Sequence, residues 1–469
     1  MQLPRLPLQI SERKTLLMLV DLLLVNSAIL IALWIWTLRD PQLSFSLEFI
    51  LSQAQWFVIL TALWLFLASL NSFYNLRLAD YFRLSGVALL RITALVLLIY
   101  LGLYFAAPRN MLPRLFILYF GVASLSLVGL WRAGYVLLLS RAPFRRRALI
   151  VGAGWAGRTI AQAMRENLGL GYHLVGFVDD DPAKQEQIIG DLPVLGTRRD
   201  LATLARANGV AEVVLAITHD VDGELLQILM DCQEQGIAIT HMPTLYEELT
   251  GRVPVEHIGD NWYIALPLDH AATGGFYPLV KRGIDIVVAA VGLLVFAVFL
   301  PFIVLALHLY SPGPIFYTQE RVGRGGRSYR VLKLRTMTPQ AERDGQAVWA
   351  RPNDPRVTRV GRVLRWMHLD ELPQFVNVLK GEMSIVGPRP ERPEFVAELE
   401  KQIPFYRARH AVKPGMAGWA LINYGYAGSV EDALVRLQYD LYYIKHQSIW
   451  LDLFILIRTV WSMLTLKGR

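Results

Sequence analysis

Charged residues are scarce in this 469-residue sequence: they make up 18% of it, whereas apolar residues (with Tyr and Cys counted) make up 54%. Ordinary soluble proteins carry roughly 25% charged residues, so a wholly soluble multidomain protein is excluded. Intrinsic disorder is excluded too, because disordered chains combine high net charge with few apolar residues. The length suffices for two or three domains of about 100–200 residues each. The composition therefore predicts a membrane protein with substantial soluble parts.

Cysteine occurs once, at Cys232, so no intramolecular disulfide can form. This usage suits domains in a reducing cytosol. Acidic residues are also outnumbered, with 39 Asp and Glu against 47 Lys and Arg, and the formal net charge is +8. The positive excess clusters beside apolar segments, which favours anionic lipid or phosphorylated substrates over nucleic acid as partners.

Four apolar stretches occupy the N-terminal quarter, at 16–38, 49–70, 87–106 and 115–139. Each approaches the ~20 residues that a helix needs to cross the hydrocarbon core of a bilayer. The first is too long, and lies too far into the chain, for a signal peptide. We therefore expect a four-helix transmembrane bundle over residues 1–140.

The loops between these stretches predict the orientation of the bundle. One side carries nine basic residues and the other carries three, and cytoplasmic loops are the ones enriched in Lys and Arg. Both ends of the bundle are thus predicted to be cytoplasmic. The nine are Arg5, Arg13, Lys14, Arg77, Arg83, Arg141, Arg145, Arg146 and Arg147, and the three are Arg39, Arg109 and Arg114.

Two polar residues, Asp21 and Asn26, interrupt the first predicted span. Polar groups inside membrane helices are candidates for function. The simpler interpretation is an interhelical hydrogen bond or a place near the membrane interface, and nothing in the bundle resembles a transport pathway.

In the middle of the chain, a pattern of alternating strands and helices predicts a Rossmann-like α/β domain over 145–265. A short strand at Ala148–Val151 leads into Gly152-Ala-Gly154-Trp-Ala-Gly157 and an apolar-periodic helix to about Asn167. This is the G-x-G-x-x-G pattern in its strand–turn–helix context, in which glycines let a pyrophosphate approach helix-terminal N–H groups. Further strands are expected at 174–178, 194–196, 212–217 and 237–241, with a helix at 225–235.

Asp179 follows the predicted strand at 174–178, about where an acid that binds a ribose would lie. The stretch resembles the nucleotide-binding part of bacterial nucleotide-sugar dehydratases. Nucleotide or nucleotide-sugar binding and a degenerate fold used for regulation or assembly both remain open. An active NAD-dependent enzyme is disfavoured, because no Tyr-x-x-x-Lys pair follows the fingerprint.

A further apolar run follows Lys281-Arg282, from Gly283 to about Leu309. It is long enough to cross a bilayer, but a crossing would place the rest of the chain away from cytosolic nucleotide substrates. Pro301 removes a backbone hydrogen bond inside the run and kinks a helix. We therefore expect a broken, re-entrant helix over 283–309 that returns to the cytoplasmic face.

Paired carboxylates follow in the C-terminal third. Asp370 and Glu371 are expected directly before a helix that Pro373 starts and Gly381 ends. A carboxylate there is favoured by the helix dipole, and an Asp carboxylate can attack a phosphoryl group. Phosphoryl transfer also needs positive charge around the moving group. Three residues are candidates for that charge: Lys333, Arg365 and Arg389.

The motifs of this third occur in a characteristic order. They are Ser311–Gly323, Tyr329–Met337, Arg365–Gly381, Glu382–Pro390, Lys413–Trp419 and Asp440–Lys445. In this order they resemble the bacterial polyprenyl-phosphate sugar-1-phosphate transferases, the monotopic phosphoglycosyl transferases, over residues 275–469. The preceding bundle and Rossmann-like domain resemble the large members, of the undecaprenyl-phosphate glucose or galactose phosphotransferase type.

The resemblance implies a two-step reaction with Mg²⁺ as cofactor. Asp370 would displace UMP from a UDP-sugar, glucose or galactose being the sugar, and undecaprenyl phosphate would then collect the sugar phosphate. Asp370 and Glu371 would also hold the metal, Lys333, Arg365 and Arg389 would grip phosphate, and Pro388 and Pro390 would frame the nucleotide pocket. An α/β catalytic domain on the re-entrant helix, a multi-pass place in the bacterial inner membrane and a homodimer are implied as well.

The implied pathway is capsule, exopolysaccharide or O-antigen synthesis. The Trp and basic residues of about 449–466 predict a C-terminal interfacial helix that lies on the bilayer. Two departures from the family pattern matter. The helix break is Leu300-Pro301 rather than Ser-Pro, and 419–428 lacks an expected Arg. Two alternatives stay open: a nucleotide-sugar dehydratase or oxidoreductase centred on the middle domain, and a non-catalytic scaffold for polysaccharide assembly.

Overall fold

The structure is a computed structural model, and it describes most of the chain in ten stretches. These are residues 10–40, 42–106, 114–138, 146–166, 172–217, 222–255, 275–311, 313–338, 354–425 and 429–464. The described residues form two compact units, the first running to Met242 and the second beginning at Pro243. Several predicted features lie outside these stretches: the loop arginines Arg5, Arg109, Arg141 and Arg145, residues 256–265, residues 426–428, and 465–466.

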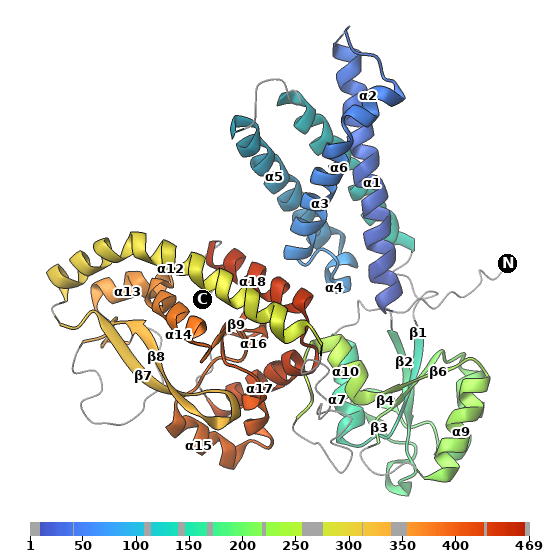
Figure 1. The fold of residues 1–469 in the computed structure, drawn as a ribbon. Coiled ribbons are helices and arrows are strands. Elements are labelled where there is room, and N and C mark those ends of the chain that lie inside the picture. Colours follow the sequence, from blue (N-terminus) through green and yellow to red (C-terminus); the bar gives the residue numbers. More distant parts are fainter. Residues whose placement is uncertain are drawn as a thin grey trace. The chain divides into compact units, whose positions relative to one another are not determined.

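Six helices form the N-terminal part of the first unit (Figure 1). Three of them are long and apolar enough to cross a membrane, and they match the first, third and fourth predicted spans. The second predicted span is divided at Gln53 into a short helix and a 17-residue one. The helices are α1 (Ile10–Arg39), α2 (Leu47–Ser52), α3 (Ala54–Leu70), α4 (Leu76–Ala79), α5 (Phe82–Ala106) and α6 (Arg114–Leu138).

A buried ion pair joins α1 to α6. Arg132 NH2 lies 2.6 Å from Asp21 Oδ2, and both side chains are almost wholly buried. The Arg132 guanidinium also lies over the ring of Phe73, 4.1 Å from its centroid. Asn26 accepts a hydrogen bond from Thr61 of α3 at 3.4 Å. The prediction that Asp21 and Asn26 make interhelical contacts is therefore confirmed.

The first unit also holds an α/β domain built on a four-stranded sheet. Its strands are all parallel and run in the order β2-β1-β5-β6 (Figure 1). The strands are β1 (Arg146–Val151), β2 (Tyr172–Val178), β5 (Glu212–Leu215) and β6 (Ala238–His241). The main helices are α7 (Trp155–Glu166), α8 (Leu201–Ala207) and α9 (Gly223–Glu234), with short 3-10 turns at Pro182–Lys184 and Arg198–Asp200.

One expected strand of this domain is absent from the described sheet. At 194–196 only Val194 makes a single bridge, to Phe177. The residues just before it form a small antiparallel hairpin, β3 (Ile188–Ile189) with β4 (Leu192–Pro193). Pro193 lacks a backbone N–H, which limits how far that pairing can extend.

The second unit contains the C-terminal helices and two pairs of strands, β7 with β8 and β9 with β10. Its strands are β7 (Phe316–Val322), β8 (Ser328–Leu334), β9 (Ser384–Val386) and β10 (Gly415–Ala417). Its helices are α10 (Met242–Thr250), α12 (Tyr277–Tyr310), α13 (Arg359–Trp366), α14 (Phe375–Lys380), α15 (Pro393–Gln402), α16 (Trp419–Asn423), α17 (Val430–Lys445) and α18 (Ile449–Leu464). Short 3-10 helices lie at Arg324–Gly326, Leu369–Gln374 and Tyr406–Ala411.

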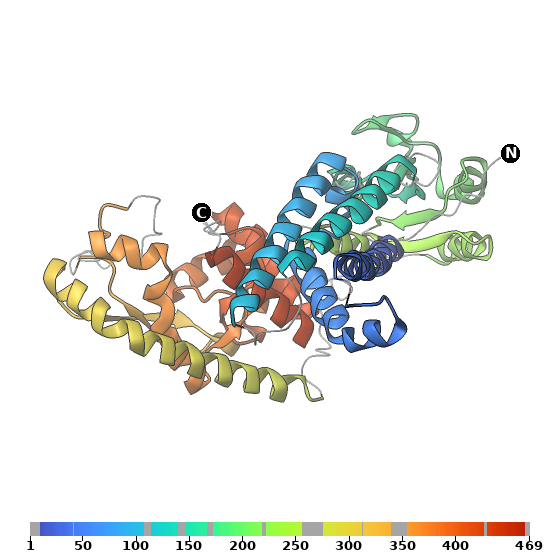
Figure 2. The same ribbon diagram turned by 90° about the horizontal axis from the view of Figure 1, so that it is seen from above.

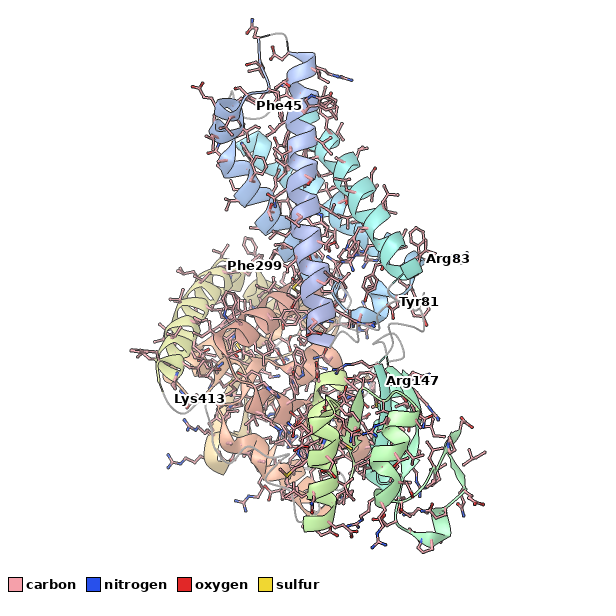
Figure 3. The ribbon with its side chains drawn as sticks, turned by 90° about the vertical axis from the view of Figure 1, so that its right-hand side faces the viewer. Phe45, Tyr81, Arg83, Arg147, Phe299 and Lys413 are labelled. Carbon is pink, nitrogen blue, oxygen red and sulfur yellow. The ribbon has the colours of Figure 1, made fainter. Side chains whose placement is uncertain are left out.

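Helix α12 is continuous over 34 residues and passes through Pro301 without an interruption (Figure 2). The break expected at Leu300-Pro301 is therefore not seen in this helix. One stripe of α12 is apolar and exposed, with Val287, Val291, Leu294 and Val298 on it. Phe299, which Figure 3 labels, is likewise exposed. The opposite side carries Ala289, Phe296, Ile303 and Leu307, which are buried in the unit.

The segment after β6 packs with the second unit, although it was expected to belong to the middle domain. Val253 and Val255 lie in the core of the second unit, and Val253 N donates to Gln438 O at 3.0 Å. Glu247 of α10 forms an ion pair with Lys445 at 2.8 Å. Residues 243–255 thus complete the core in which the C-terminal motifs lie.

Candidate active site

The hairpin of β7 and β8 positions Lys333, which pairs with Tyr317 in the antiparallel register. Asn377, on the helix that follows the paired carboxylates, binds the backbone of β8 at two points just before Lys333. Its Oδ1 accepts from Leu332 N at 3.0 Å, and its Nδ2 donates to Arg330 O at 2.8 Å. The Lys333 backbone is therefore held against the element that carries Asp370 and Glu371.

Asp370 and Glu371 lie inside a 3-10 helix, Leu369–Gln374. This corrects the expectation that Pro373 starts an α-helix directly after them: α14 begins only at Phe375. The predicted end is confirmed, because Gly381 caps α14 with a φ of 85°, in the left-handed region that glycine adopts freely. His368, just before the 3-10 helix, also has a positive φ of 56°.

Arg389 reaches the site from a tightly packed loop after β9. Strand β9 pairs in parallel with β10, and glycines at 387 and 415 let the two backbones meet. A Cβ added to Gly387 would lie 2.4 Å from Lys413 O, and one added to Gly415 would lie 2.1 Å from Gly387 N. These close backbone contacts restrict the conformation of the Gly-Pro-Arg-Pro loop.

Glu371 binds two of the predicted phosphate-binding residues. Its Oε1 lies 2.8 Å from Lys333 Nζ and 2.7 Å from Arg389 NH2, and its Oε2 lies 3.4 Å from Arg389 NH1. Burial opposes ionisation of Glu371, but Arg389 and Lys333 outweigh it and hold its pKa well below the ordinary value. Glu371 is therefore a carboxylate at neutral pH.

Asp370 has a different environment, although it is the adjacent residue. It is 9% exposed, and its side chain accepts no hydrogen bond from the described residues. Burial and the negative charge of Glu371 raise its pKa above the ordinary value, against the attraction of Lys333, Arg365 and Arg389. Asp370 is thus the more basic carboxylate of the two, with oxygens available to a ligand.

The structure gives Arg365 a different role from that of Lys333 and Arg389. Its Nε donates to Thr336 Oγ1 at 2.9 Å, so it is anchored to the segment after β8 rather than to Glu371. Its charge still acts on Asp370. All three predicted basic residues therefore gather around the dyad, two by contact and one through its field.

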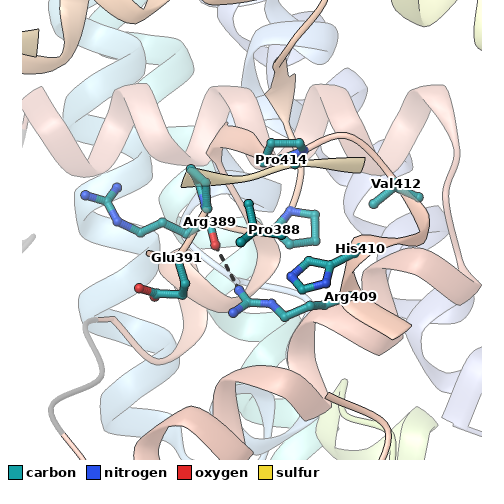
Figure 4. Close-up of a pocket in the computed structure, with 10 residues that line it drawn as sticks. Pro388, Arg389, Glu391, Arg409, His410, Val412 and Pro414 are labelled. Atoms are coloured by element: carbon teal, nitrogen blue, oxygen red, sulfur yellow. Dashed lines mark hydrogen bonds between the residues drawn. The ribbon is translucent and has the colours of Figure 1, made fainter. Parts of the chain in front are cut away.

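Pro388 and Pro390 line a pocket beside the dyad loop, shown in Figure 4. The pocket is also lined by Arg409, His410, Val412 and Pro414. Arg389 contributes its backbone here, and its carbonyl accepts from Arg409 NH2 at 2.9 Å. One residue thus borders the pocket with its backbone and binds Glu371 with its side chain.

Two buried ion pairs support this region. Arg409 pairs with Asp440 at 2.8 Å and Arg436 with Glu391 at 2.7 Å. The sequence motifs include Asp440 and Asn377 without a predicted role for either, and Arg409 and Glu391 lie outside the motifs. No local pattern signals the two ion pairs, because they join residues 31 and 45 positions apart in the chain.

The site offers few side chains that could coordinate a metal ion. In the stretches that the structure describes, no group of three or more His, Cys, Asp or Glu residues is arranged to hold a metal ion. Mg²⁺ usually takes only one or two protein carboxylates and completes its shell with water and substrate phosphates. Asp370 and Glu371 fit that requirement once a phosphorylated substrate is bound.

The chain is similar to several known proteins. A family model described as bacterial sugar transferase matches residues 276–466, and one described as CoA-binding domain matches 68–243. A UDP-N-acetylgalactosamine-undecaprenyl-phosphate N-acetylgalactosaminephosphotransferase of Aeromonas hydrophila is 38% identical over 63% of this chain and 67% of its own. A UDP-glucose:undecaprenyl-phosphate glucose-1-phosphate transferase of Escherichia coli K12 is 33% identical over 71% and 75%.

The chain belongs to the bacterial polyprenyl-phosphate sugar-1-phosphate transferases. A shorter UDP-glucose:undecaprenyl-phosphate glucose-1-phosphate transferase, of Caulobacter vibrioides, is 45% identical over 39% of this chain and 70% of its own. The resemblance stated from the motifs is therefore confirmed, and the protein is an enzyme of this transferase class.

In the middle domain of this transferase, two of the three glycines in the glycine-rich loop are required by backbone conformation or close packing. A Cβ on Gly157 would lie 1.9 Å from Gly152 O, and Gly152 itself has a φ of 101°. Gly154 meets no atom within 4 Å of such a Cβ. Asp179 accepts from Ala153 N at 2.7 Å and pairs with Lys184 at 3.2 Å. The acid expected to bind a ribose is thus bonded to the loop itself.

Proposed function

We propose that this protein transfers a sugar-1-phosphate from a UDP-sugar to undecaprenyl phosphate and releases UMP. The relatives from Aeromonas hydrophila and Escherichia coli carry these substrates in their names. Glucose or galactose was expected from the motifs, and the relatives name glucose and N-acetylgalactosamine, so all three belong in a donor panel. The product would begin a lipid-linked glycan for capsule, exopolysaccharide or O-antigen.

The observation that carries this proposal is the unequal environment of the two carboxylates. Glu371 is neutralised by Lys333 and Arg389, whereas Asp370 has oxygens without a hydrogen-bond partner among the described residues. A nucleophile needs an accessible lone pair and a basic oxygen, and its neighbours must stabilise the charge on the moving group. Asp370 meets the first requirement, and the cations around Glu371 meet the second.

In the first step an Asp370 Oδ attacks the phosphorus that bears the sugar. The bond from that phosphorus to the UMP oxygen breaks, UMP leaves with the electron pair, and an aspartyl-phosphate ester of the sugar remains. In the second step an oxygen of undecaprenyl phosphate attacks the same phosphorus and releases the Asp370 carboxylate. Lys333, Arg365 and Arg389 offset the negative charge that gathers in both steps.

Mg²⁺, when bound, would supply further charge neutralisation at the phosphates, with Asp370 and Glu371 as its protein ligands. Lys333 and Arg389 contact Glu371 Oε1, and Arg389 NH1 also lies 3.4 Å from Oε2, so the Asp370 oxygens are the ones without a side-chain contact among the described residues.

A re-entrant place for α12 is supported by its contacts along the catalytic unit. Asp285 accepts hydrogen bonds from Ser384 Oγ and Ile385 N, both at 2.9 Å. A Cβ on Gly292 would meet the Phe375 ring at 2.3 Å, and Ile303 packs with Leu334 and Leu364 further along. These contacts extend over about 27 Å of helix, close to the ~30 Å of a hydrocarbon core. A perpendicular crossing would draw the catalytic unit into the bilayer.

The positive-inside pattern supports an inner-membrane, multi-pass protein whose middle and catalytic domains are cytoplasmic. Exposed Trp450, Leu453 and Val460 on α18 support an interfacial helix there. The parallel order β2-β1-β5-β6 supports a Rossmann-like middle domain. We include in the proposal a role of this domain in regulation or assembly, and a homodimer.

The test is UMP release by the purified full-length protein with undecaprenyl phosphate, Mg²⁺ and UDP-glucose, UDP-galactose or UDP-N-acetylgalactosamine. We expect UMP from one donor, dependent on lipid and suppressed by EDTA. A phosphosugar adduct on the peptide containing Asp370, trapped without lipid acceptor and read by mass spectrometry, would support the covalent route. Equal UMP release by Asp370→Asn would overturn that route.

A further inference from the structure

One ion pair of the catalytic unit has no part in the transfer chemistry. It joins Lys281, near the start of α12, to Asp452 of α18 at 2.7 Å. Both side chains are mostly buried, with 17% and 7% of their surfaces exposed. A charge buried in this way is costly unless all of its hydrogen bonds are made. The partners of the ammonium group therefore indicate what it holds in place.

All three protons of the Lys281 ammonium group have acceptors. Besides Asp452 Oδ2, they reach the Tyr443 hydroxyl and the backbone carbonyl of Val386, each at 3.1 Å. Burial and the negative charge of Asp452 raise the pKa of Tyr443 well above its ordinary value, so the hydroxyl keeps its proton. That hydroxyl lies 3.2 Å from Val386 O but only 2.7 Å from Asp452 Oδ1. Because a hydroxyl has one proton to donate, Lys281 is the main donor to the Val386 carbonyl.

The Val386 carbonyl lies at the end of β9, directly before the loop that carries Arg389. A second charged residue of α12 binds the same strand: Asp285 accepts from Ile385 N at 2.9 Å. Residues four apart lie on one face of a helix, as Lys281 and Asp285 do. This face of α12 therefore binds β9 at two neighbouring residues, once through a carbonyl and once through an N–H group.

The connection from β9 to Arg389 is short and closely packed. Only two residues separate Val386 from Arg389, and Gly415 N donates to Pro388 O at 2.8 Å within this stretch. The Arg389 guanidinium lies 2.7 Å from Glu371 at the other end. Because the backbone between these points is restricted, a shift of the end of β9 moves the guanidinium relative to the dyad.

We propose that Lys281 is a positioning residue for the transfer reaction: it holds the end of β9 so that Arg389 reaches Glu371. Asp452 and Tyr443 keep the ammonium group in place and balance its charge. The inference rests on the proposed function, because Arg389 offsets charge that gathers in that reaction. It also gives α12 and α18 a joint role, since both contribute to the hydrogen bonds that fix a cation of the active site.

The test replaces the hydrogen-bonded group by apolar residues of similar size, Lys281→Met, Tyr443→Phe and Asp452→Leu, in one full-length protein. Exchanging a whole buried ionic group in this way is often neutral for stability, so this triple variant should melt near the wild type. We expect its kcat for UMP release to fall about tenfold, with KM for the donor within about twofold, because a displaced Arg389 stabilises the transition state less well. Lys281→Met with Asp452→Asn, which keeps an oxygen for Tyr443 to bind, is a second variant with the same expected loss. Lys401→Met, at an exposed lysine of α15, is the matched control.

A double-mutant cycle with Arg389 separates positioning from general support of the fold. In an Arg389→Ala background the triple substitution should change kcat by less than about twofold, because the residue through which it acts is gone. An equal loss in both backgrounds would overturn the proposal, since a purely structural role does not depend on Arg389. Unchanged kcat in the triple variant and in the second variant would overturn it as well.

Hydrogen exchange gives a readout that needs no turnover. Gly387 N donates to Ala417 O at 2.9 Å, so the peptide 384–390 should exchange faster in the triple variant, with α15 as the reference peptide. Unchanged exchange of that peptide would contradict the positioning role. Failure of the wild type to release UMP from any donor would instead count against the proposed function, and the exchange comparison would still decide whether Lys281 holds the loop.

Discussion

Arg389 NH2 lies 2.7 Å from Glu371 Oε1, across 18 residues of sequence, and Lys333 Nζ approaches the same oxygen from the neighbouring hairpin. Two cations on one carboxylate leave the adjacent Asp370 as the carboxylate without a hydrogen-bond partner among the described residues. This asymmetry gives two neighbouring acids different chemistry, and the predictions on catalysis follow from it.

Asp370→Asn is expected to reduce turnover by more than about 10³-fold, because the amide removes the attacking oxygen while keeping the shape of the side chain. UMP release with the preferred donor is the measurement. Asp181→Asn, at an exposed position of the middle domain, is the matched control and should behave as wild type. Comparable activity of the two variants would contradict the assignment of the nucleophile.

The acid limb of the pH–rate profile should move in Glu371→Gln. Asp370 must be ionised to attack, so the rate falls as the pH drops through its raised pKa. Removing the negative charge of Glu371 lowers the pKa of Asp370, and the acid limb then shifts to lower pH. We also expect a loss of roughly 10²-fold in the plateau rate, because the cations lose their anchor. An acid limb shifted to higher pH would refute this coupling.

Arg389→Ala should reduce turnover by roughly 10²-fold, and Arg389→Lys should recover only part of it. Lysine keeps the charge but replaces the two-nitrogen contact with Glu371 by a single ammonium group. The Glu371 pKa should rise in Arg389→Ala, since a cation that lowers it is gone. Kinetics for the three proteins provide the measurement, with Arg330→Ala, an exposed residue of β8, as control. A fully active lysine variant would show that charge alone suffices.

Asp21→Ala should destabilise the membrane bundle by about 3–5 kcal/mol, because it leaves the buried Arg132 without its carboxylate. Thermal unfolding in detergent measures the effect, and Glu48→Ala, at an exposed acid of α2, should change little. Replacing both partners by apolar residues, Asp21→Leu with Arg132→Met, should cost less than Asp21→Ala. A larger loss in the double variant would mean that the pair does more than balance charge.

Two glycines of the middle domain should respond differently to alanine. Gly157→Ala places a methyl group 1.9 Å from Gly152 O and is expected to lower stability by about 1–3 kcal/mol. Gly154→Ala meets open space and should leave the melting temperature unchanged. Melting curves of the full-length variants compare them directly. Equal destabilisation by both would contradict the packing role assigned to Gly157.

The local patterns of the sequence predicted local structure well. Apolar runs of about 20 residues located α1, α5 and α6, since a helix that faces lipid must be apolar over a bilayer's thickness. Gly381 marked the end of α14 because a left-handed residue there favours glycine. Strand β1, its glycine turn and α7 followed from a pattern in which each glycine has a steric reason.

Long-range partners were beyond such patterns. The sequence placed Lys333 and Arg389 near phosphate, yet nothing in it said that both bind Glu371 and leave Asp370 available. Nor did it show that Asp179 bonds its own loop, that residues 243–255 pack with the catalytic unit, or that α12 continues through Pro301. Periodicity and turn chemistry act within a few residues, so the sequence by itself determined the elements and the residue types at the site. Which charge neutralises which depends on the packing of elements far apart in the chain, and only the tertiary structure decided that.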